Sequence, residues 1–251
     1  MRFTVVIPAR YDSQRLPKKA LLDIAGKPMV QRVYEQACKS NAESVIVATD
    51  DQRIADVVMS FGGRCCMTSR DHPSGTDRIQ EVIGRESLPD DSIVVNVQGD
   101  EPLIPPEVIN QVAANLQQYD VPMATLYEAI GSLEDVLDPN IVKVVLDRDD
   151  LALYFSRAPI PWDRDRLPDG FSTATGYKRH IGIYAYRASL LNSYVSWEPD
   201  PVEAIERLEQ LRVLRRGVKI HVAEAIKQIP PGIDTEKDLL RTRALFETRT
   251  P

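Results

Sequence analysis

The chain is poor in cysteine and has no long apolar segment. Its 251 residues include three cysteines, Cys38, Cys65 and Cys66, and none of them sits in a Cys-x-x-Cys pair. A disulfide framework or a zinc site is therefore not expected, and we predict small, buried thiols in a reducing cytoplasm. No apolar run approaches the roughly 18 residues of a membrane span, and we expect no signal peptide.

The chain also lacks an excess of basic residues. It has 31 Lys and Arg against 37 Asp and Glu, which gives a formal net charge of −6. A general nucleic-acid binder carries a basic surface, so this composition argues against that class. A local cationic pocket for a small anion remains compatible with it.

The loop after the first expected strand, residues 3–7, lacks the glycines of a Walker A or dinucleotide fingerprint. It carries four cations instead, Arg10, Arg15, Lys18 and Lys19. In an open α/β sheet, ligands bind outside the carboxyl ends of the strands. This loop therefore suits a nucleoside triphosphate held mainly by side chains. The missing fingerprint argues against a nicotinamide-dependent dehydrogenase.

Strand-like and helix-like segments alternate over the first hundred residues, which predicts a doubly wound, mostly parallel α/β sheet. We expect strands at 3–7, 44–49, 64–67 and 93–97, with helices after Pro28, around 54–58 and at 77–86. From about residue 123 the pattern predicts strands with little helix between them, at 142–146, 151–156 and 181–186. A long loop at 159–179, a helix at 202–216, a strand at 219–224 and a capped helix at 236–247 follow. We expect a single domain, residues 1–251.

Two aspartates are candidates for holding a divalent cation. Asp100 lies shortly after the strand at 93–97, and Asp234 lies just before the last helix. Mg²⁺ prefers one or two carboxylates together with phosphate oxygens and water. The alternatives are a turn residue for Asp100 and a helix-entry residue for Asp234.

Two further segments have polar residues where a ligand could bind. Residues 74–78 precede and open a helix, so their backbone N–H groups suit an anion or a base edge, although Ser74 or Thr76 could be a plain helix cap. The long loop and its exit carry six cationic or titratable side chains, which suit a carboxylate or belong to a solvated loop: Arg157, Arg164, Arg166, Lys178, Arg179 and His180.

Short motifs spread over nearly the whole chain resemble those of the sugar-acid cytidylyltransferases, in the branch that acts on 3-deoxy-manno-octulosonate (KDO). They are IPARY at 7–11, RLP at 15–17, AGKPM at 25–29, VATD at 47–50, SGTDR at 74–78, NVQGDEP at 96–102, ALYFSR at 152–157, IPW at 160–162, RHIGIY at 179–184, LEQLR at 208–212 and GIDT at 232–235. Each motif alone is weak evidence. Their occurrence together and in this order is strong evidence.

The resemblance implies a Rossmann-like nucleotidyltransferase fold and transfer of CMP from CTP to the anomeric hydroxyl of KDO. Pyrophosphate is released, and the product serves lipopolysaccharide synthesis. The CTP site would consist of Arg10, Arg15, Lys19, Ser74, Gly75, Arg78 and Asp100, with Arg10, Lys19, Asp100 and Asp234 as catalytic residues. Asp100 and Asp234 would hold Mg²⁺ as the cofactor. The sugar site would consist of Gln98, Arg157, Arg164, His180, Tyr184, Glu209 and Gln210.

The resemblance further implies a cytoplasmic homodimer, with about residues 123–200 forming the sugar-binding and dimerisation elaboration. One motif departs from the family pattern, because Lys18 replaces a glycine and Ala20 replaces a proline in the cationic loop. A loop conformation with positive φ at Lys18 would be strained. Alternatives for the function are the same chemistry on 8-amino-KDO or sialic acid, and a nucleotide-sensing module without catalysis.

Overall fold

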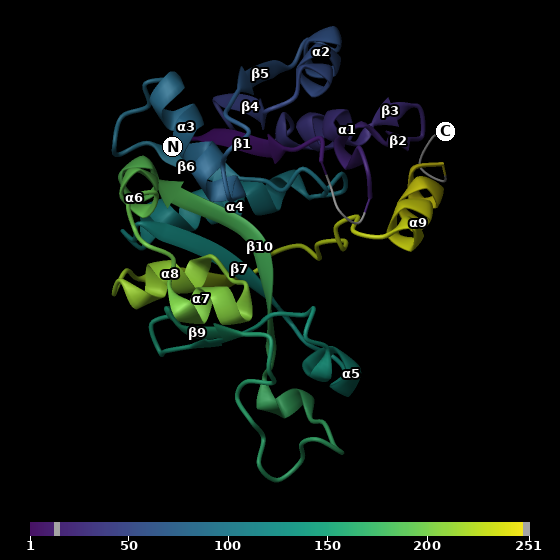
Figure 1. The fold of residues 1–251 in the computed structure, drawn as a ribbon. Helices are drawn as coiled ribbons and strands as arrows, with labels where there is room; N and C mark the ends of the chain where they lie inside the picture. Colours follow the sequence, from purple (N-terminus) through teal and green to yellow (C-terminus); the bar gives the residue numbers. More distant parts are fainter. Residues whose placement is uncertain (13–15, 248–251) are drawn as a thin grey trace.

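The structure, a computed structural model, describes residues 1–12 and 16–247 (Figure 1). Its strands are β1 (Thr4–Ala9), β2 (Asp23–Ile24), β3 (Lys27–Pro28), β4 (Ser44–Thr49), β5 (Arg64–Met67), β6 (Ile93–Asn96), β7 (Met123–Ala129), β8 (Lys143–Leu146), β9 (Ala152–Ser156), β10 (Lys178–Arg187) and β11 (Ile220–Glu224). Its α-helices are α1 (Met29–Ala37), α2 (Gln52–Ser60), α3 (Gly75–Arg85), α4 (Pro106–Gln118), α5 (Leu133–Leu137), α6 (Ala188–Tyr194), α7 (Pro201–Glu206), α8 (Gln210–Arg215) and α9 (Glu236–Glu247). Short 3-10 helices lie at Lys19–Leu21 and Thr173–Thr175.

A central sheet runs through the molecule in the order β11-β7-β10-β6-β1-β4-β5. Strands β6, β1, β4 and β5 run parallel to one another, and β7 and β11 form a second parallel pair. Strand β10 is antiparallel to both β6 and β7. The prediction of a doubly wound, mostly parallel sheet is confirmed, and β10 is the strand that reverses direction within it.

Helices cover both faces of this sheet because alternate residues of each buried strand point to opposite sides. On β1, Val5 and Ile7 pack into a core with the apolar faces of α1, α2 and α4. Val6 points the other way, into a core that includes residues of α3, α6 and α8. The polar ends of the parallel strands are left open at one edge of the sheet, which is where a ligand can bind.

Strand β10 connects the body of the molecule to a lobe beyond it (Figure 1). We call this the distal lobe and define it as β8, β9, α5 and residues 157–177. Strand β10 pairs with β7 in both of its halves, whereas only its second half, from Tyr184 to Arg187, also pairs with β6. In its first half, Arg179 pairs with Lys143 of β8. The first half of β10 therefore reaches past the carboxyl end of β6 and brings later residues to that edge.

The predicted strands and the last helix are confirmed to within a few residues. Thr235 and Asp238 cap α9 reciprocally: the Thr235 N–H donates to Asp238 Oδ2 at 3.0 Å, and the Asp238 N–H donates to Thr235 Oγ1 at 3.3 Å. The single helix predicted at 202–216 is wrong. Arg207 adopts a left-handed conformation, with φ 53°, which ends α7 and lets the chain turn before α8.

Two other expectations need correction. Helices α5 and α6 lie in the second half of the chain, where little helix was predicted. The three cysteines are free thiols, but only Cys66 is buried, whereas Cys65 is half-buried and Cys38 is exposed. Among residues 1–12 and 16–247, no helix has the length and hydropathy needed to cross a membrane.

Candidate functional site

Gly99 fixes the position of Asp100 against the end of β1. A Cβ atom on Gly99 would lie 2.6 Å from the carbonyl oxygen of Pro8, so only glycine allows this close approach of two backbones. The Ile233 N–H donates to the Asp100 carbonyl at 2.9 Å, which joins the segment before α9 to the same point. Residues from β1, β6 and the C-terminal segment therefore meet at the open edge of the sheet.

Lys19 lies between the two predicted metal ligands. Its Nζ donates to Asp100 Oδ2 at 2.6 Å and to Asp234 Oδ1 at 3.0 Å. The Lys19 side chain is 15% exposed, so this ion-pair cluster is partly shielded from water. The two aspartates are 134 positions apart in sequence, and in the structure both pair with the ammonium group of Lys19. Holding one metal ion together would require this proximity.

The donor set at this point fits Mg²⁺. Two carboxylates reach the same small volume, and Mg²⁺ binds to one or two carboxylates plus substrate phosphates and water. No group of three or more His, Cys, Asp or Glu side chains with the geometry of a metal site occurs among the described residues. Asp100 and Asp234 could therefore hold an ion only together with ligands from a substrate or solvent.

The cationic loop uses the backbone conformation that the sequence pattern indicated. Lys18 has φ 58° and ψ 28°, in the left-handed region. Glycine adopts this backbone conformation readily, whereas a residue with a Cβ atom is strained in it. It directly precedes the 3-10 turn that carries Lys19. Arg10 follows β1, half-buried at the same edge. Arg15 lies outside the described residues, so its predicted contact with CTP stays a prediction.

The start of α3 presents backbone N–H groups next to the end of β1. Ser74 caps the helix by accepting a hydrogen bond from the Asp77 N–H at 3.2 Å. A Cβ on Gly75 would lie 3.6 Å from Pro8, so this first turn packs against the end of β1. The expected helix cap and the expected cytosine site are thus at the same place, and both uses are geometrically compatible.

Arg78 is placed differently from what the resemblance implied. Its side chain is completely buried, and its guanidinium donates to Thr68 Oγ1 and to Asp50 Oδ2, the latter at 2.8 Å. Asp50 follows β4 and Thr68 follows β5, so Arg78 ties α3 to two strand ends. This placement favours a role in positioning the start of α3 over a direct contact with CTP.

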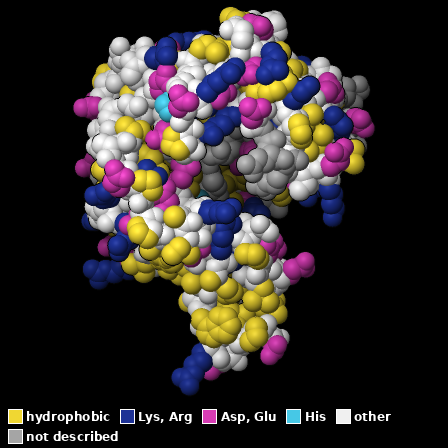
Figure 2. Space-filling view, in the orientation of Figure 1, with side chains coloured by type: hydrophobic (Ala, Val, Ile, Leu, Met, Phe, Trp, Pro, Cys, Tyr) yellow, Lys and Arg dark blue, Asp and Glu magenta, His cyan; other side chains and the backbone are white. Residues whose placement is uncertain are grey.

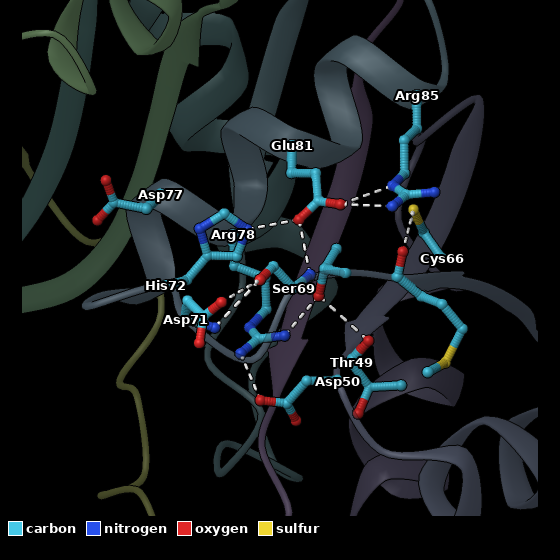
Figure 3. A network of polar contacts seen from close by, with 12 residues as sticks. Thr49, Asp50, Cys66, Ser69, Asp71, His72, Asp77, Arg78, Glu81 and Arg85 are labelled. Carbon is cyan, nitrogen blue, oxygen red and sulfur yellow. Dashed lines mark hydrogen bonds and ion pairs between the residues drawn. The ribbon is translucent and has the colours of Figure 1, made fainter.

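A second polar cluster supports the other side of α3 (Figure 3). The Glu81 carboxylate pairs with Arg85 at 2.7 Å, accepts a hydrogen bond from the Ser69 N–H at 2.8 Å and contacts the imidazole of His72. Burial of Glu81 opposes its charged form, but these three partners together hold the pKa of the carboxyl down at about 2. The ionised carboxylate therefore anchors the loop before α3 to the helix.

Replacing Glu81 with glutamine should destabilise the protein by about 1–3 kcal/mol at pH 7, since the lowered pKa is a measure of native-state stabilisation. The native pKa is below the unfolded one, so this contribution is present above about pH 4.5 and is lost as pH falls toward 2. Urea unfolding of wild type and Glu81→Gln at pH 7 and at steps down to pH 3 measures the gap. The stabilising role of the ionised Glu81 carboxylate is contradicted if the difference in unfolding free energy between wild type and Glu81→Gln does not change with pH. It is also contradicted if this difference is as small as that of the surface control Glu43→Gln.

A cavity of about 470 Å³ lies next to Asp100, close to which Gly232 forms part of the cavity lining. Five of the seven predicted sugar-site residues line it: Gln98, His180, Tyr184, Glu209 and Gln210. Gly232 lies at its outer end, where a Cβ would be 3.5 Å from Asp100 Oδ1. The antiparallel strand β10 and helix α8 thus bring residues from the second half of the chain next to Gln98. The cavity is large enough for a small ligand beside the aspartates.

The side chains lining this cavity are mostly neutral. Burial lowers the pKa of His180 to about 3, so its imidazole is uncharged near neutral pH, and its Nε2 lies 3.1 Å from Thr125 Oγ1. Burial raises the pKa of Tyr184, and it raises that of Glu209, whose carboxylate accepts a hydrogen bond from Thr76 Oγ1 at 2.6 Å. Burial and the nearby Asp100 raise the pKa of Glu101 to about 8. This lining suits a ligand rich in hydroxyl groups.

The two arginines predicted to bind the sugar lie outside the cavity lining. Arg157 is half-buried and donates to the Glu206 carbonyl at 2.7 Å and to the Pro139 carbonyl at 2.9 Å. Arg164 is exposed in the distal lobe. A direct role in sugar binding stays a prediction for both. Arg157 is already engaged with the backbone beside α7 and would have to exchange partners to reach a ligand.

If Arg157 does bind the anionic sugar, Arg157→Ala should weaken KDO binding about 10- to 100-fold, the effect of losing a charge-assisted hydrogen bond. CTP binding should change less than twofold. Calorimetry with each ligand separately measures both, and Arg166→Ala in the same loop is the control, because Arg166 is exposed and pairs with Asp163. Equal losses for the two ligands count against the assignment.

Several residues that line the cavity escaped the sequence interpretation. Asn96, Tyr186 and Tyr194 lie on β6, β10 and α6, and Arg207 lies between α7 and α8. Asn96 belongs to a quoted motif, and an asparagine in an otherwise apolar strand was the available signal. Tyr194 carried no such signal, because the helix that holds it was itself not predicted.

The fold agrees with comparisons to known proteins. A family model described as cytidylyltransferase matches residues 4–220. The 3-deoxy-manno-octulosonate cytidylyltransferase of Vibrio vulnificus is 59% identical over 251 residues and covers 100% of both chains. The protein of the same name from Photobacterium profundum is 59% identical over 247 residues, which is 98% of this chain and 100% of that one.

Solved structures give the same result. A structure of CMP:2-keto-3-deoxy-manno-octonic acid synthetase complexed with CTP superposes with a TM-score of 0.90 at 42% identity, over 100% of both chains. A cytidylyltransferase from Leptospira borgpetersenii serovar Hardjo-bovis has a TM-score of 0.62 at 14% identity, covering 100% of this chain and 88% of that one. The second likeness concerns the fold alone.

Proposed function

Because the chain belongs to the 3-deoxy-manno-octulosonate cytidylyltransferases, a nucleotidyltransferase family, we propose that it transfers CMP from CTP to the anomeric hydroxyl of KDO and releases pyrophosphate. The observation that carries this proposal is the pairing of both Asp100 and Asp234 with Lys19, next to Gly232 in the lining of the cavity. Cations and carboxylates for a metal-bound triphosphate lie at one end of a neutral, polar pocket for a sugar.

The reaction is an in-line attack of a sugar hydroxyl on the α-phosphorus, for which positioning and charge neutralisation are the main requirements. Arg10 and Lys19 bind the triphosphate, while the first turn of α3 takes the cytosine through its backbone N–H groups. Gln98, Tyr184 and Glu209 orient the sugar beside it. We assign no protein group as general base.

Asp100 and Asp234 are the residues that would hold Mg²⁺. When bound, the ion would act as a Lewis acid that neutralises charge on the phosphates and lowers the pKa of a coordinated hydroxyl. The protein contributes two carboxylates, positioned by Gly99, by the Ile233 N–H bond to the Asp100 carbonyl and by Lys19. Neither Asp100 nor Asp234 needs a third protein ligand when phosphate oxygens complete the shell.

We also propose that the protein works in the cytoplasm as a homodimer that supplies activated KDO to lipopolysaccharide synthesis. Support for the dimer comes from the distal lobe, where hydrophobic side chains gather on the surface (Figure 2). Leu153 and Trp162 in this lobe are 61% and 56% exposed. Exposed apolar groups of this size are typical of protein interfaces. Sedimentation of the purified protein tests the dimer.

Pyrophosphate release tests the function directly. The purified protein is incubated with CTP and Mg²⁺ and with KDO, 8-amino-KDO or sialic acid in turn, and we expect the highest kcat/KM with KDO. Faster turnover of 8-amino-KDO or sialic acid would change the substrate while keeping the chemistry. CTP binding without pyrophosphate release from any sugar acid would favour the nucleotide-sensing alternative.

A further inference from the structure

Three residues that line the cavity carry buried polar atoms without partners among the described residues, and we call the part of the cavity that they line its inner end. Tyr194 is 2% exposed, and Asn96 and Gln210 are each 4% exposed. The Tyr194 hydroxyl, Asn96 Oδ1 and Gln210 Nε2 make no hydrogen bond with any other described residue. All three side chains line the cavity, and they come from α6, β6 and α8.

Such a concentration of unpartnered atoms indicates a binding subsite. A buried polar group without a hydrogen bond costs about 1–3 kcal/mol, and native proteins leave few of them. Here three belong to side chains that line one cavity, and together they offer one acceptor, one donor and one hydroxyl that can do either. A ligand hydroxyl can accept from Gln210 Nε2 or the Tyr194 hydroxyl while donating to Asn96 Oδ1.

The direction of the cavity shows which part of a substrate reaches this end. The chain passes from Asn96 through Gln98 to Asp100, so the inner subsite and the metal-binding carboxylates lie at opposite ends of that segment. Asn96, Gln98 and Gly232 all line the cavity, and of these Gly232 lies next to Asp100. A sugar whose anomeric hydroxyl reacts beside Asp100 must therefore point its other end inward.

We propose that Tyr194, with Asn96 and Gln210, determines specificity for the hydroxylated two-carbon tail of the sugar acid, the part farthest from the reacting hydroxyl. This inference rests on the proposed function. It explains why the enzyme would prefer an acceptor that has the two-carbon tail. A bound sugar acid without the tail leaves these three groups unpaired, whereas the full-length acceptor forms hydrogen bonds with them.

The test compares two acceptors in wild type and Tyr194→Phe. One is KDO, and the other is a six-carbon 3-deoxy-2-ketoaldonate that keeps the ring and carboxylate but lacks the tail. We expect Tyr194→Phe to lower kcat/KM for KDO about tenfold, the effect of one lost hydrogen bond. The value for the short acceptor should stay within about twofold, so the preference for KDO falls about tenfold. The KM for CTP should not change.

Tyr177→Phe is the matched control, because Tyr177 is also buried, at 3% exposure, but does not line the cavity. It should leave the preference unchanged. Equal losses for both acceptors, or a change in CTP affinity, would overturn the proposal. If Tyr194→Phe does not fold, Asn96→Ala must show the same selective loss, measured by calorimetric binding of the two acceptors. Absence of turnover by the wild type with every sugar acid would instead contradict the proposed function.

Discussion

Replacing Asp100 with asparagine should reduce CMP transfer by at least two to three orders of magnitude while leaving the fold intact. Asp100 lies 2.6 Å from Lys19 and converges with Asp234 on the same point. An amide keeps the size and one acceptor oxygen but removes the negative charge that a divalent cation needs. Loss of such preorganised electrostatic stabilisation typically costs 10²–10³-fold in kcat.

The measurement is initial-rate pyrophosphate release at saturating CTP, KDO and Mg²⁺, with circular dichroism and thermal unfolding as checks on the fold. Asp23→Asn is the matched control, because Asp23 is exposed on β2 and accepts one backbone hydrogen bond, from Gly26, at 3.2 Å. Turnover near that of the wild type in Asp100→Asn at saturating Mg²⁺ would refute the metal-binding role. An equal loss in Asp23→Asn would show that the effect is not specific to the site.

The outer part of the site was readable from the sequence because it follows simple rules of strand ends. A buried strand followed by Gly99 and Asp100 places a carboxylate at the sheet edge, and β1 delivers Arg10 and Lys19 to the same edge. Even the strain at Lys18 could be anticipated from its replacement of a glycine. These features depend on local pattern and on the carboxyl-edge rule for parallel sheets.

The inner part of the site depends on tertiary contacts that no local pattern reports. Arg78 looked like a ligand-facing cation in a loop-to-helix motif, yet it is buried against Asp50 and Thr68. Arg207 adopts a left-handed conformation that ends α7, although the sequence around it has the periodicity of one continuous helix. Tyr194 faces the cavity only because β10 reverses direction and α6 packs behind it. Long-range pairing decides these positions.

Replacing Lys19 with methionine should separate the two functions of its ammonium group, which are to neutralise the aspartates and to bind the triphosphate. In the structure it neutralises Asp100 and Asp234, at 2.6 and 3.0 Å, whereas in catalysis we assign it to the triphosphate. A divalent cation must therefore displace Lys19 from the carboxylates, and the nucleotide phosphates offer the lysine its new partner. We expect Lys19→Met to bind Mn²⁺ about tenfold more tightly than wild type without nucleotide, while CTP binding weakens and kcat falls about 10²–10³-fold.

Mn²⁺ titration followed by electron paramagnetic resonance measures metal binding without catalysis, with and without CTP. In the wild type, CTP should strengthen Mn²⁺ binding for two reasons, because its phosphates complete the metal's shell and because they draw Lys19 away from the carboxylates. In Lys19→Met only the second contribution is lost, so CTP should strengthen Mn²⁺ binding about tenfold less than it does in the wild type. Lys27→Met is the control, because Lys27 pairs with Glu35 at 2.7 Å away from the site. Weaker Mn²⁺ binding by Lys19→Met in the absence of CTP would mean that the lysine holds the carboxylates together for the metal rather than competing with it.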